Sequence, residues 1–222
     1  MKLIVVAMYE EIEGFLNSES FVIVEHQFLK IYKNDKTYLL ITGIGLVNAA
    51  LTLSAFLAIY QNEVTQIYNF GSAGSSSKNL QVFDIVVANR VYYSTVDLTG
   101  FGYAYGQIPK ESEYFEMTLA QSILMKLSPN FDVHSSNLAS SDIFISDENK
   151  FENFVIKASK SIEVFDMEAA ALCHVAKKFA KPINVIKLIS DNLLIKNNEV
   201  QFSEFIGEIS LKMKEIINVV LK

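Results

Sequence analysis

The sequence has few of the residues on which several classes of functional site depend. Its 222 residues include three prolines, three histidines, the single cysteine Cys173 and the single arginine Arg90. One cysteine excludes an intramolecular disulfide and a cysteine-rich metal site, and it suits a reducing compartment such as the cytoplasm. One arginine excludes a cluster of guanidinium groups of the kind that grips phosphate through paired hydrogen bonds.

Positive charge and long hydrophobic runs are also scarce. The net charge of −6 disfavours nucleic acid and anionic membranes as partners, because both would be repelled. The first apolar run, LIVVAM, is only six residues long and is followed at once by the acidic stretch YEEIE. We therefore expect a buried strand there, and neither a signal peptide nor a membrane anchor.

Several catalytic and cofactor-binding motifs are missing as well. The sequence contains no HExxH, CxxC, Walker A, GxGxxG or GxSxG pattern. Metal, nucleoside triphosphate, dinucleotide and serine-hydrolase chemistry therefore have no support from motifs.

The residues that are abundant indicate a compact α/β fold. Half of the chain is hydrophobic and 20% is charged, which favours one domain spanning residues 1–222. Hydrophobic spacing predicts a strand at Leu3–Met8, a helix at Glu10–Leu16, a hairpin formed by Phe21–Ile31 and Thr37–Ile41, and a helix at Leu46–Ile59.

The later part of the chain continues the alternation of strands and helices. We expect strands in VTQIYNFGSAG, in DIVVANRVYYSTVDLT and in PINVIKLISDNL, and a weaker one from Val133 that ends at SSDIFI. Helices are predicted at Tyr114–Leu127 and from about Phe202 to Leu221. This order predicts a three-layer α/β/α sandwich around a mixed, largely parallel sheet.

Acids and glycines gather where the predicted strands end. Four of the six segments that follow the predicted strands contain an acid. In chain order these segments are Glu10 with Glu11, TGIG, FGSAG, SSDIF, DMEAA and ISD. Acids at helix starts are often only caps, which is an adequate reading of Glu10, Glu11 and Asp166. Glu168 is harder to dismiss, because a carboxylate between an apolar strand and a helix of small residues is costly without a partner.

The other titratable residues carry weaker signals. Asp191 is either a helix cap or a functional acid, His174 is expected to pack inside a helix, and His26 and His134 fall on half-exposed strands. Ligands of such sheets bind beyond the carboxyl ends of the strands. A pocket of acids, aromatics and small residues there suits a neutral ligand rich in hydroxyls, and cleavage of a glycosidic bond fits paired carboxylates.

Seven motifs together carry a family resemblance. The motifs are AMYEEIE, TGIGLVNAA, NFGSAG, VDLTGFGYAYGQIP, SSDIFI, VFDMEAAALCHV and KLISDN. Over about residues 1–215 the chain resembles the 5′-methylthioadenosine/S-adenosylhomocysteine nucleosidases of the nucleoside phosphorylase superfamily. The resemblance implies a cofactor-free hydrolase that splits the bond between adenine and ribose.

The resemblance also implies roles for individual residues. Asp191, with Ser190 beside it, would protonate N7 of adenine, and Glu11 would activate the attacking water near Ser72. Glu168 would accept hydrogen bonds from the ribose 2′- and 3′-hydroxyls, so a buried acid there would be satisfied by its ligand.

Further positions would shape the pocket. Met167 would pack against the sugar, Phe144 would stack on adenine, and the backbone of Ile145 and of the Ser72–Ala73–Gly74 turn would bind the base. Ile44 and Phe202 would form apolar walls. In the family a partner subunit completes the pocket, which implies a homodimer in which Phe101 and Pro109 line the partner's 5′-thio site.

Four positions depart from the commoner family pattern, namely Tyr9, Phe70, Asn192 and Lys187, where Lys187 replaces an arginine that helps to position water and the acids. The alternatives are a 6-amino-6-deoxyfutalosine nucleosidase, a purine nucleoside phosphorylase and a non-catalytic nucleoside-binding protein. A phosphorylase is disfavoured by the single arginine and by Glu11, since a carboxylate repels phosphate. The sequence does not separate the two nucleosidase activities.

Overall fold

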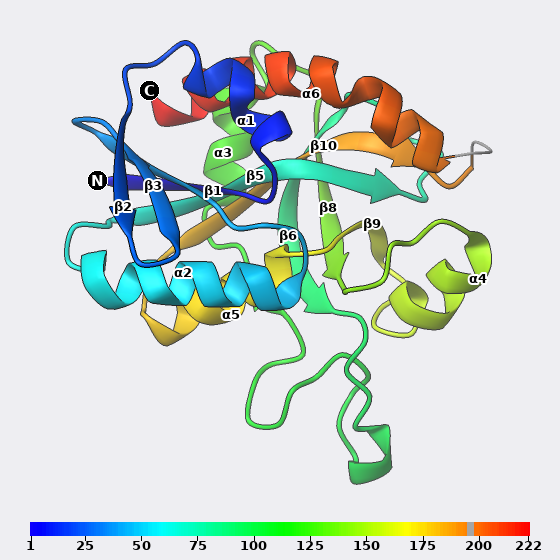
Figure 1. Ribbon diagram of the computed structural model, residues 1–222. Coiled ribbons are helices and arrows are strands. Elements are labelled where there is room, and N and C mark those ends of the chain that lie inside the picture. The colour runs from blue at the N-terminus through cyan, green and yellow to red at the C-terminus, as the bar shows by residue number, and fades with distance from the viewer. Residues whose placement is uncertain (195–197) are drawn as a thin grey trace.

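A mixed β-sheet forms the centre of the protein (Figure 1). The computed structural model describes residues 1–194 and 198–222, and of residues 198–206 it describes the backbone alone. Strand β1 (Lys2–Val6) lies between β4 (Thr37–Ile41) and β5 (Gln66–Ser75) and runs parallel to both. These apolar runs form strands because both faces of the sheet are covered.

The sheet closes on itself over part of its width. The remaining strands are β2 (Val22–His26), β3 (Leu29–Lys33), β6 (Ile85–Tyr93), β7 (Phe115–Glu116), β8 (Val133–Ser140), β9 (Ile162–Asp166) and β10 (Ile183–Asn192). The order is β10-β6-β8-β9-β5-β1-β4-β3-β2, and β10 also pairs with β5. The two longest ladders are parallel, β10 with β5 over nine residue pairs and β6 with β8 over seven.

Helices cover both faces of the sheet (Figure 1). On one face lie α2 (Leu46–Tyr60) and α5 (Ala169–Lys178), and on the other α1 (Tyr9–Leu16), α3 (Ala120–Leu127) and α6 (Asn198–Leu221). The short turns η1 (Thr99–Phe101), α4 (Glu148–Lys150) and η2 (Phe151–Ile156) belong to the connections. The predicted α/β/α sandwich with a mixed, largely parallel sheet is confirmed.

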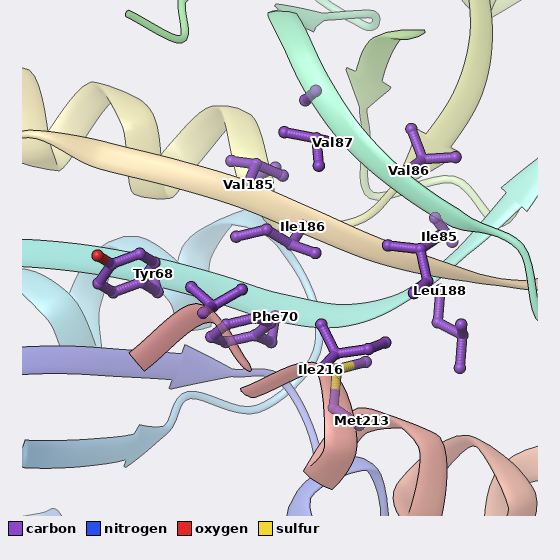
Figure 2. Packing of buried hydrophobic residues seen from close by; sticks show 14 of the residues in the cluster. Tyr68, Phe70, Ile85, Val86, Val87, Val185, Ile186, Leu188, Met213 and Ile216 are labelled. Atoms are coloured by element: carbon purple, nitrogen blue, oxygen red, sulfur yellow. The ribbon is translucent and has the colours of Figure 1, made fainter. Parts of the chain in front are cut away.

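The main core lies between the sheet and α6. Figure 2 shows Tyr68 and Phe70 of β5 and Ile186 of β10 facing Met213 and Ile216 of α6, and of these only Tyr68 retains any exposure, at 3%. Each such side chain contributes about 1.5–3 kcal/mol when it is fully buried. This packing fixes β5 and β10, whose ends carry the acids and glycines noted in the sequence.

Two predicted elements differ from the structure. The helix predicted at Tyr114–Leu127 begins only at Ala120, because Phe115 pairs with Val91 as part of β7. The strand predicted at Phe21–Ile31 is divided into β2 and β3 by a turn at Gln27, where φ is 53°. In the first case pairing with a strand that is distant in sequence overrides the local pattern, and in the second the chain turns back so that β2 and β3 pair with each other, His26 opposite Leu29.

Two element ends also differ from their predicted places. Strand β6 ends at Tyr93, before the end of DIVVANRVYYSTVDLT, whereas β8 ends as predicted at Ser140, the first residue of SSDIFI. Helix α6 begins at Asn198, earlier than the predicted Phe202. Residues 94–114, with η1 at their tip, form a protruding loop that extends away from the sandwich (Figure 1). In the described residues we find no helix long and apolar enough to cross a membrane.

Candidate active site

One cavity collects the ends of β1, β5, β9 and β10 and the loop after β8. Its volume is about 130 Å³, and it is lined by Ala7, Met8, Glu11, Ile44, Ser72, Ala73, Gly74, Ile143, Phe144, Ile145, Phe165, Asp166, Met167, Glu168, Ser190 and Asp191. Two larger hollows, of about 790 and 1080 Å³, lie around Tyr114–Thr118 and beside the chain termini. Neither gathers buried carboxylates, so the chemistry points to the smaller cavity.

Glu11 is held in the cavity by three donors. It is the third residue of α1 and is only 2% exposed. Its Oε1 accepts hydrogen bonds from the Ser72 N–H at 2.7 Å and the Ser72 hydroxyl at 2.6 Å, and its Oε2 accepts one from the Met8 N–H at 3.2 Å. A Cβ at Gly71 would lie 3.2 Å from Oε1, so glycine leaves room for this approach.

Asp191 lies near the end of β10, after an irregularity in the pairing of β10 with β5. Its side chain is 2% exposed, and its Oδ1 accepts a hydrogen bond from the Ser190 hydroxyl at 2.7 Å. A Cβ on Gly74 would lie 3.0 Å from Asp191 Oδ2 and 2.2 Å from the Phe165 ring. The glycine of FGSAG therefore makes room for the acid as well as for the aromatic ring.

Glu168 is the residue immediately before α5, where the sequence indicated a buried acid. It is 6% exposed, and its Oε1 accepts a hydrogen bond from the Gly45 N–H at 2.9 Å. Burial raises the pKa of Glu168 to about 7, and the charge of Asp166 adds to this rise, while Lys187 and the Gly45 N–H oppose it. Near neutral pH this carboxyl group can therefore exchange its proton.

A buried ion pair lies close to Glu168 and affects its charge. Lys187 Nζ lies 2.8 Å from Asp166 Oδ2, and the two side chains are 2% and 1% exposed. Asp166 also accepts hydrogen bonds from the Ser140 hydroxyl at 2.5 Å and from the Ala169 N–H. Burial alone would lower the pKa of Lys187, but the charges of Asp166 and Glu168 outweigh it and raise that pKa.

The predicted site residues fall into three groups. Eleven of them line the cavity, with Ile44 and Phe144 at its rim, where they are 51% and 39% exposed. Lys187 does not line the cavity, and it forms an ion pair with Asp166, which does.

The third group lies elsewhere in the chain. Phe101, which is 81% exposed, and Pro109 belong to the protruding loop and lie outside their own chain's cavity. The predicted wall residue Phe202 falls in the part of α6 whose side chains lie outside the described residues.

Several cavity residues were not identified from the sequence. Ala7 and Met8 follow β1 directly, so their place at a strand end could have revealed them. Ile143 and Phe165 carry no such signal, because packing alone turns them inward. Asp166, for which the sequence favoured a structural role, both lines the cavity and forms the ion pair.

The arrangement is suited to acid–base chemistry. Glu11, Glu168 and Asp191 face one cavity together with an aromatic ring and a turn of small residues. Within residues 1–194 and 198–222, the one group with metal-ligand spacing is Asp84, Asp132 and His134, which is not part of this cavity. The cavity thus offers groups that donate and accept protons.

Comparison with known proteins agrees with this chemistry. Residues 2–222 match the model of the Phosphorylase superfamily. The 5′-methylthioadenosine/S-adenosylhomocysteine nucleosidase of Bacillus cytotoxicus is 34% identical over 83% of this chain and 80% of its own length. The enzyme of the same name from Bacillus cereus strain G9842 is 31% identical over 97% and 96% of the two chains.

Solved structures resemble the protein over its whole length. A Borrelia burgdorferi protein bound to adenine is 31% identical, with a TM-score of 0.88 and coverage of 99% and 98% of the two chains. The Streptococcus pneumoniae nucleosidase, with the transition-state inhibitor MT-ImmA, is 28% identical with a TM-score of 0.88 and coverage of 100% and 99%. The chain therefore belongs to the phosphorylase superfamily and, within it, to the 5′-methylthioadenosine/S-adenosylhomocysteine nucleosidase family.

Proposed function

We propose that the protein hydrolyses the N-glycosidic bond of 5′-methylthioadenosine and S-adenosylhomocysteine, releasing adenine and a 5-thioribose. The observation that carries this proposal is the convergence of Glu11, Glu168 and Asp191 on one buried cavity. The nucleosidase relatives from two Bacillus species, and the inhibitor and adenine bound in similar structures, support the choice of substrate.

Asp191 is the proposed general acid. In its protonated form it donates a proton to N7 of adenine, so the base leaves as a neutral molecule with the electron pair of the broken bond. The Ser190 hydroxyl, 2.7 Å from Oδ1, orients the carboxyl group. Because adenine becomes basic only as the glycosidic bond breaks, this contact acts mainly in the transition state.

Glu11 is the proposed general base. It takes a proton from water as the water oxygen bonds to the anomeric carbon of an oxocarbenium-like transition state. Both bonds from Ser72 fix Oε1, and the N–H of Met8 fixes Oε2. The carboxylate is therefore positioned before the substrate arrives, which lowers the cost of reorganisation during the reaction.

Glu168 and the neighbouring side chains would hold the substrate. Glu168 is proposed to accept hydrogen bonds from the ribose 2′- and 3′-hydroxyls, with Met167 packed against the sugar. Phe144 would stack on adenine, while the backbone of Ile145 and of the Ser72–Gly74 turn would bind its edge. Ile44 and Phe202 are proposed as apolar walls, and Lys187 as a positioning residue that acts through Asp166.

We also propose a homodimer, in which the protruding loop of one chain completes the pocket of the other. The loop presents Phe101, 81% exposed, and the start of α2 exposes Val47 at 73% and Leu51 at 53% beside the rim residue Ile44. A group of large apolar side chains that are each more than half exposed is typical of an interaction surface. Phe101 and Pro109 would line the partner's 5′-thio site. The single-domain organisation and the cytoplasmic location also remain proposals.

A phosphorolytic reaction is disfavoured by the position of the charges. Arg90 lies on β6, where it is paired with Glu116 at 3.7 Å, and it does not line the cavity. The Ser72 N–H and hydroxyl, which could bind an anion, are already used by Glu11. A phosphate ion would therefore meet a carboxylate instead of a cation.

The substrate assignment can be tested with a panel of nucleosides. Purified protein would be incubated in phosphate-free buffer with 5′-methylthioadenosine, S-adenosylhomocysteine, 6-amino-6-deoxyfutalosine and inosine, and release of the base would be followed. The proposal predicts the highest kcat/KM for the first two compounds. Preference for 6-amino-6-deoxyfutalosine would reassign the substrate, and no turnover of any compound would leave only nucleoside binding.

A further inference from the structure

A group of metal-ligating side chains lies at the starts of two neighbouring strands. Asp84 immediately precedes β6 and Asp132 immediately precedes β8. The strands are parallel, with Ile85 opposite Val133 and Val86 opposite His134. Because the candidate active site gathers the opposite, carboxyl ends of strands, this group belongs to a separate region of the molecule.

Strand geometry places the three side chains on one face. Asp132 and His134 are two residues apart, so they point to the same side of an extended chain. Asp84 occupies the adjacent position on the neighbouring strand, about 4.8 Å away in a sheet. One ligand atom from each residue lies within 4.8 Å of the other two.

The distances suit ligands around one ion better than hydrogen bonds. His134 Nε2 lies 3.5 Å from Asp84 Oδ2 and 3.6 Å from Asp132 Oδ1. Bonds of about 2.1 Å in a tetrahedral zinc site separate neighbouring ligand atoms by about 3.4 Å. The Nε2 atom is itself buried and makes no hydrogen bond within the described residues. A cation between these atoms would satisfy the nitrogen and neutralise both carboxylates.

The two carboxylates also differ in their hydrogen bonds and in their exposure to solvent. Asp84 is fixed, because its Oδ2 accepts a hydrogen bond from the Gln81 N–H at 2.7 Å and its side chain is 20% exposed. Asp132 is 85% exposed, so its carboxylate can adjust to an ion that enters from solvent. Asp84 would keep its place while the exposed carboxylate of Asp132 moves, so the three ligand atoms can come closer together around the ion.

We propose that Asp84, Asp132 and His134 form a binding site for one Zn²⁺ ion, with water completing the coordination. One imidazole and two carboxylates match the nitrogen and oxygen ligands that zinc accepts, whereas Mg²⁺ and Ca²⁺ prefer oxygen alone. The ion would bind at the strand starts and stabilise them. The other reading is a protonated His134 paired with the two acids, which requires no metal.

Zinc titration of the full-length protein separates these readings. Protein stripped with a chelator and desalted would be titrated with ZnCl₂ by calorimetry, and its Tm would be measured with and without zinc. We expect one site per chain and a higher Tm with zinc. Affinity should fall at acid pH, because protons compete for the imidazole.

Matched variants identify the ligands. His134→Gln should weaken zinc binding at least tenfold and remove the rise in Tm, and Asp132→Asn should also weaken binding. His26→Gln makes the same change on the exposed strand β2 and should leave binding unaltered. Equal zinc binding by the wild type and His134→Gln, or no binding by the wild type, would overturn the proposal. Adenine release by His134→Gln should stay normal, so the outcome is independent of the proposed enzymatic function.

Discussion

Glu168 illustrates how the environment of a single residue determines its chemistry. A carboxylate preceding a helix is usually an exposed cap, but here it is 6% exposed and has a raised pKa of about 7. Desolvation is the main cause, because burial disfavours the charged form, and hydrogen bonds from a ligand would favour it again. The ribose hydroxyls of the proposed substrate would supply them.

This pKa predicts the pH dependence of substrate capture. As the pH falls below about 7, Glu168 in the free protein becomes protonated and its capacity to accept two hydroxyl hydrogen bonds decreases. We therefore expect kcat/KM for 5′-methylthioadenosine to fall on the acid side with an apparent pKa near 7. Glu168→Gln should have a much lower kcat/KM without this acid limb, and retention of the limb by the variant would assign it to another group.

Asp191→Asn tests the general acid. The amide preserves the shape of the side chain but cannot protonate adenine, so kcat should fall by about 10²–10⁴-fold. KM should change little, because the proton transfer matters mainly in the transition state. Steady-state assays of adenine release measure both constants, and a variant with near-normal kcat would show that another residue protonates the base.

For individual residues, the sequence predicted the site best where an acid or a glycine follows a predicted strand. Glu11, Glu168 and Asp191 were predicted to lie together, and all three line the cavity. The position of Lys187 was not predictable in the same way. Strand alternation and burial turn its ammonium group toward Asp166, and a contact of that kind depends on tertiary packing.

At the scale of elements, the site depends on the close approach of β5, β9 and β10. Gly74 of β5 pairs with Phe165 of β9 and lies beside Asp191 of β10. A side chain at Gly74 would have to displace the ring of Phe165 and would also crowd the proposed acid. The absence of a Cβ therefore links sheet packing to catalysis.

Gly74→Ala and Gly207→Ala should have opposite effects on stability. The new Cβ at Gly74 would lie 2.2 Å from the Phe165 ring, so we expect the free energy of unfolding to fall by about 1–3 kcal/mol and kcat to decrease. The Cβ at Gly207 meets nothing within 4 Å inside α6, so that variant should gain about 0.5–1 kcal/mol. Denaturant unfolding measures both, and an unaffected Gly74→Ala would contradict the packing argument.

The elements themselves were predicted best where they are long and buried. The strands at Leu3–Met8 and in PINVIKLISDNL and the helix at Leu46–Ile59 agree closely with β1, β10 and α2. The helix predicted at Tyr114–Leu127 was wrong in its first half, because two residues pair with β6. Pairing with a distant strand leaves little trace in local spacing.

At the scale of the whole molecule, the protruding loop is tied to α5 by Glu111 but leaves apolar side chains exposed in an isolated chain. It carries the most exposed large apolar side chain of the described residues, Phe101 at 81%. In the proposed homodimer this ring would be buried against the partner's 5′-thio site. The loop would then contribute to substrate binding and assembly together.

Phe101→Ala should therefore raise KM for 5′-methylthioadenosine severalfold with a smaller effect on kcat. Sedimentation analysis of the wild type should give a dimer, and Leu211→Ala, which alters an exposed leucine on α6, serves as a control for loss of surface hydrophobicity. An unchanged KM in Phe101→Ala, or a wild-type monomer with full activity, would contradict a shared site.

The most direct test of the central claim is to determine whether water or phosphate forms the new bond to the anomeric carbon. Turnover of 5′-methylthioadenosine would be followed in ¹⁸O-labelled water, with and without saturating phosphate, and the sugar product would be analysed by mass spectrometry. Hydrolysis predicts an equal rate of adenine release in both buffers and one ¹⁸O in a non-phosphorylated thioribose. A thioribose 1-phosphate formed only with phosphate would contradict the assignment of Glu11 as the base that activates water.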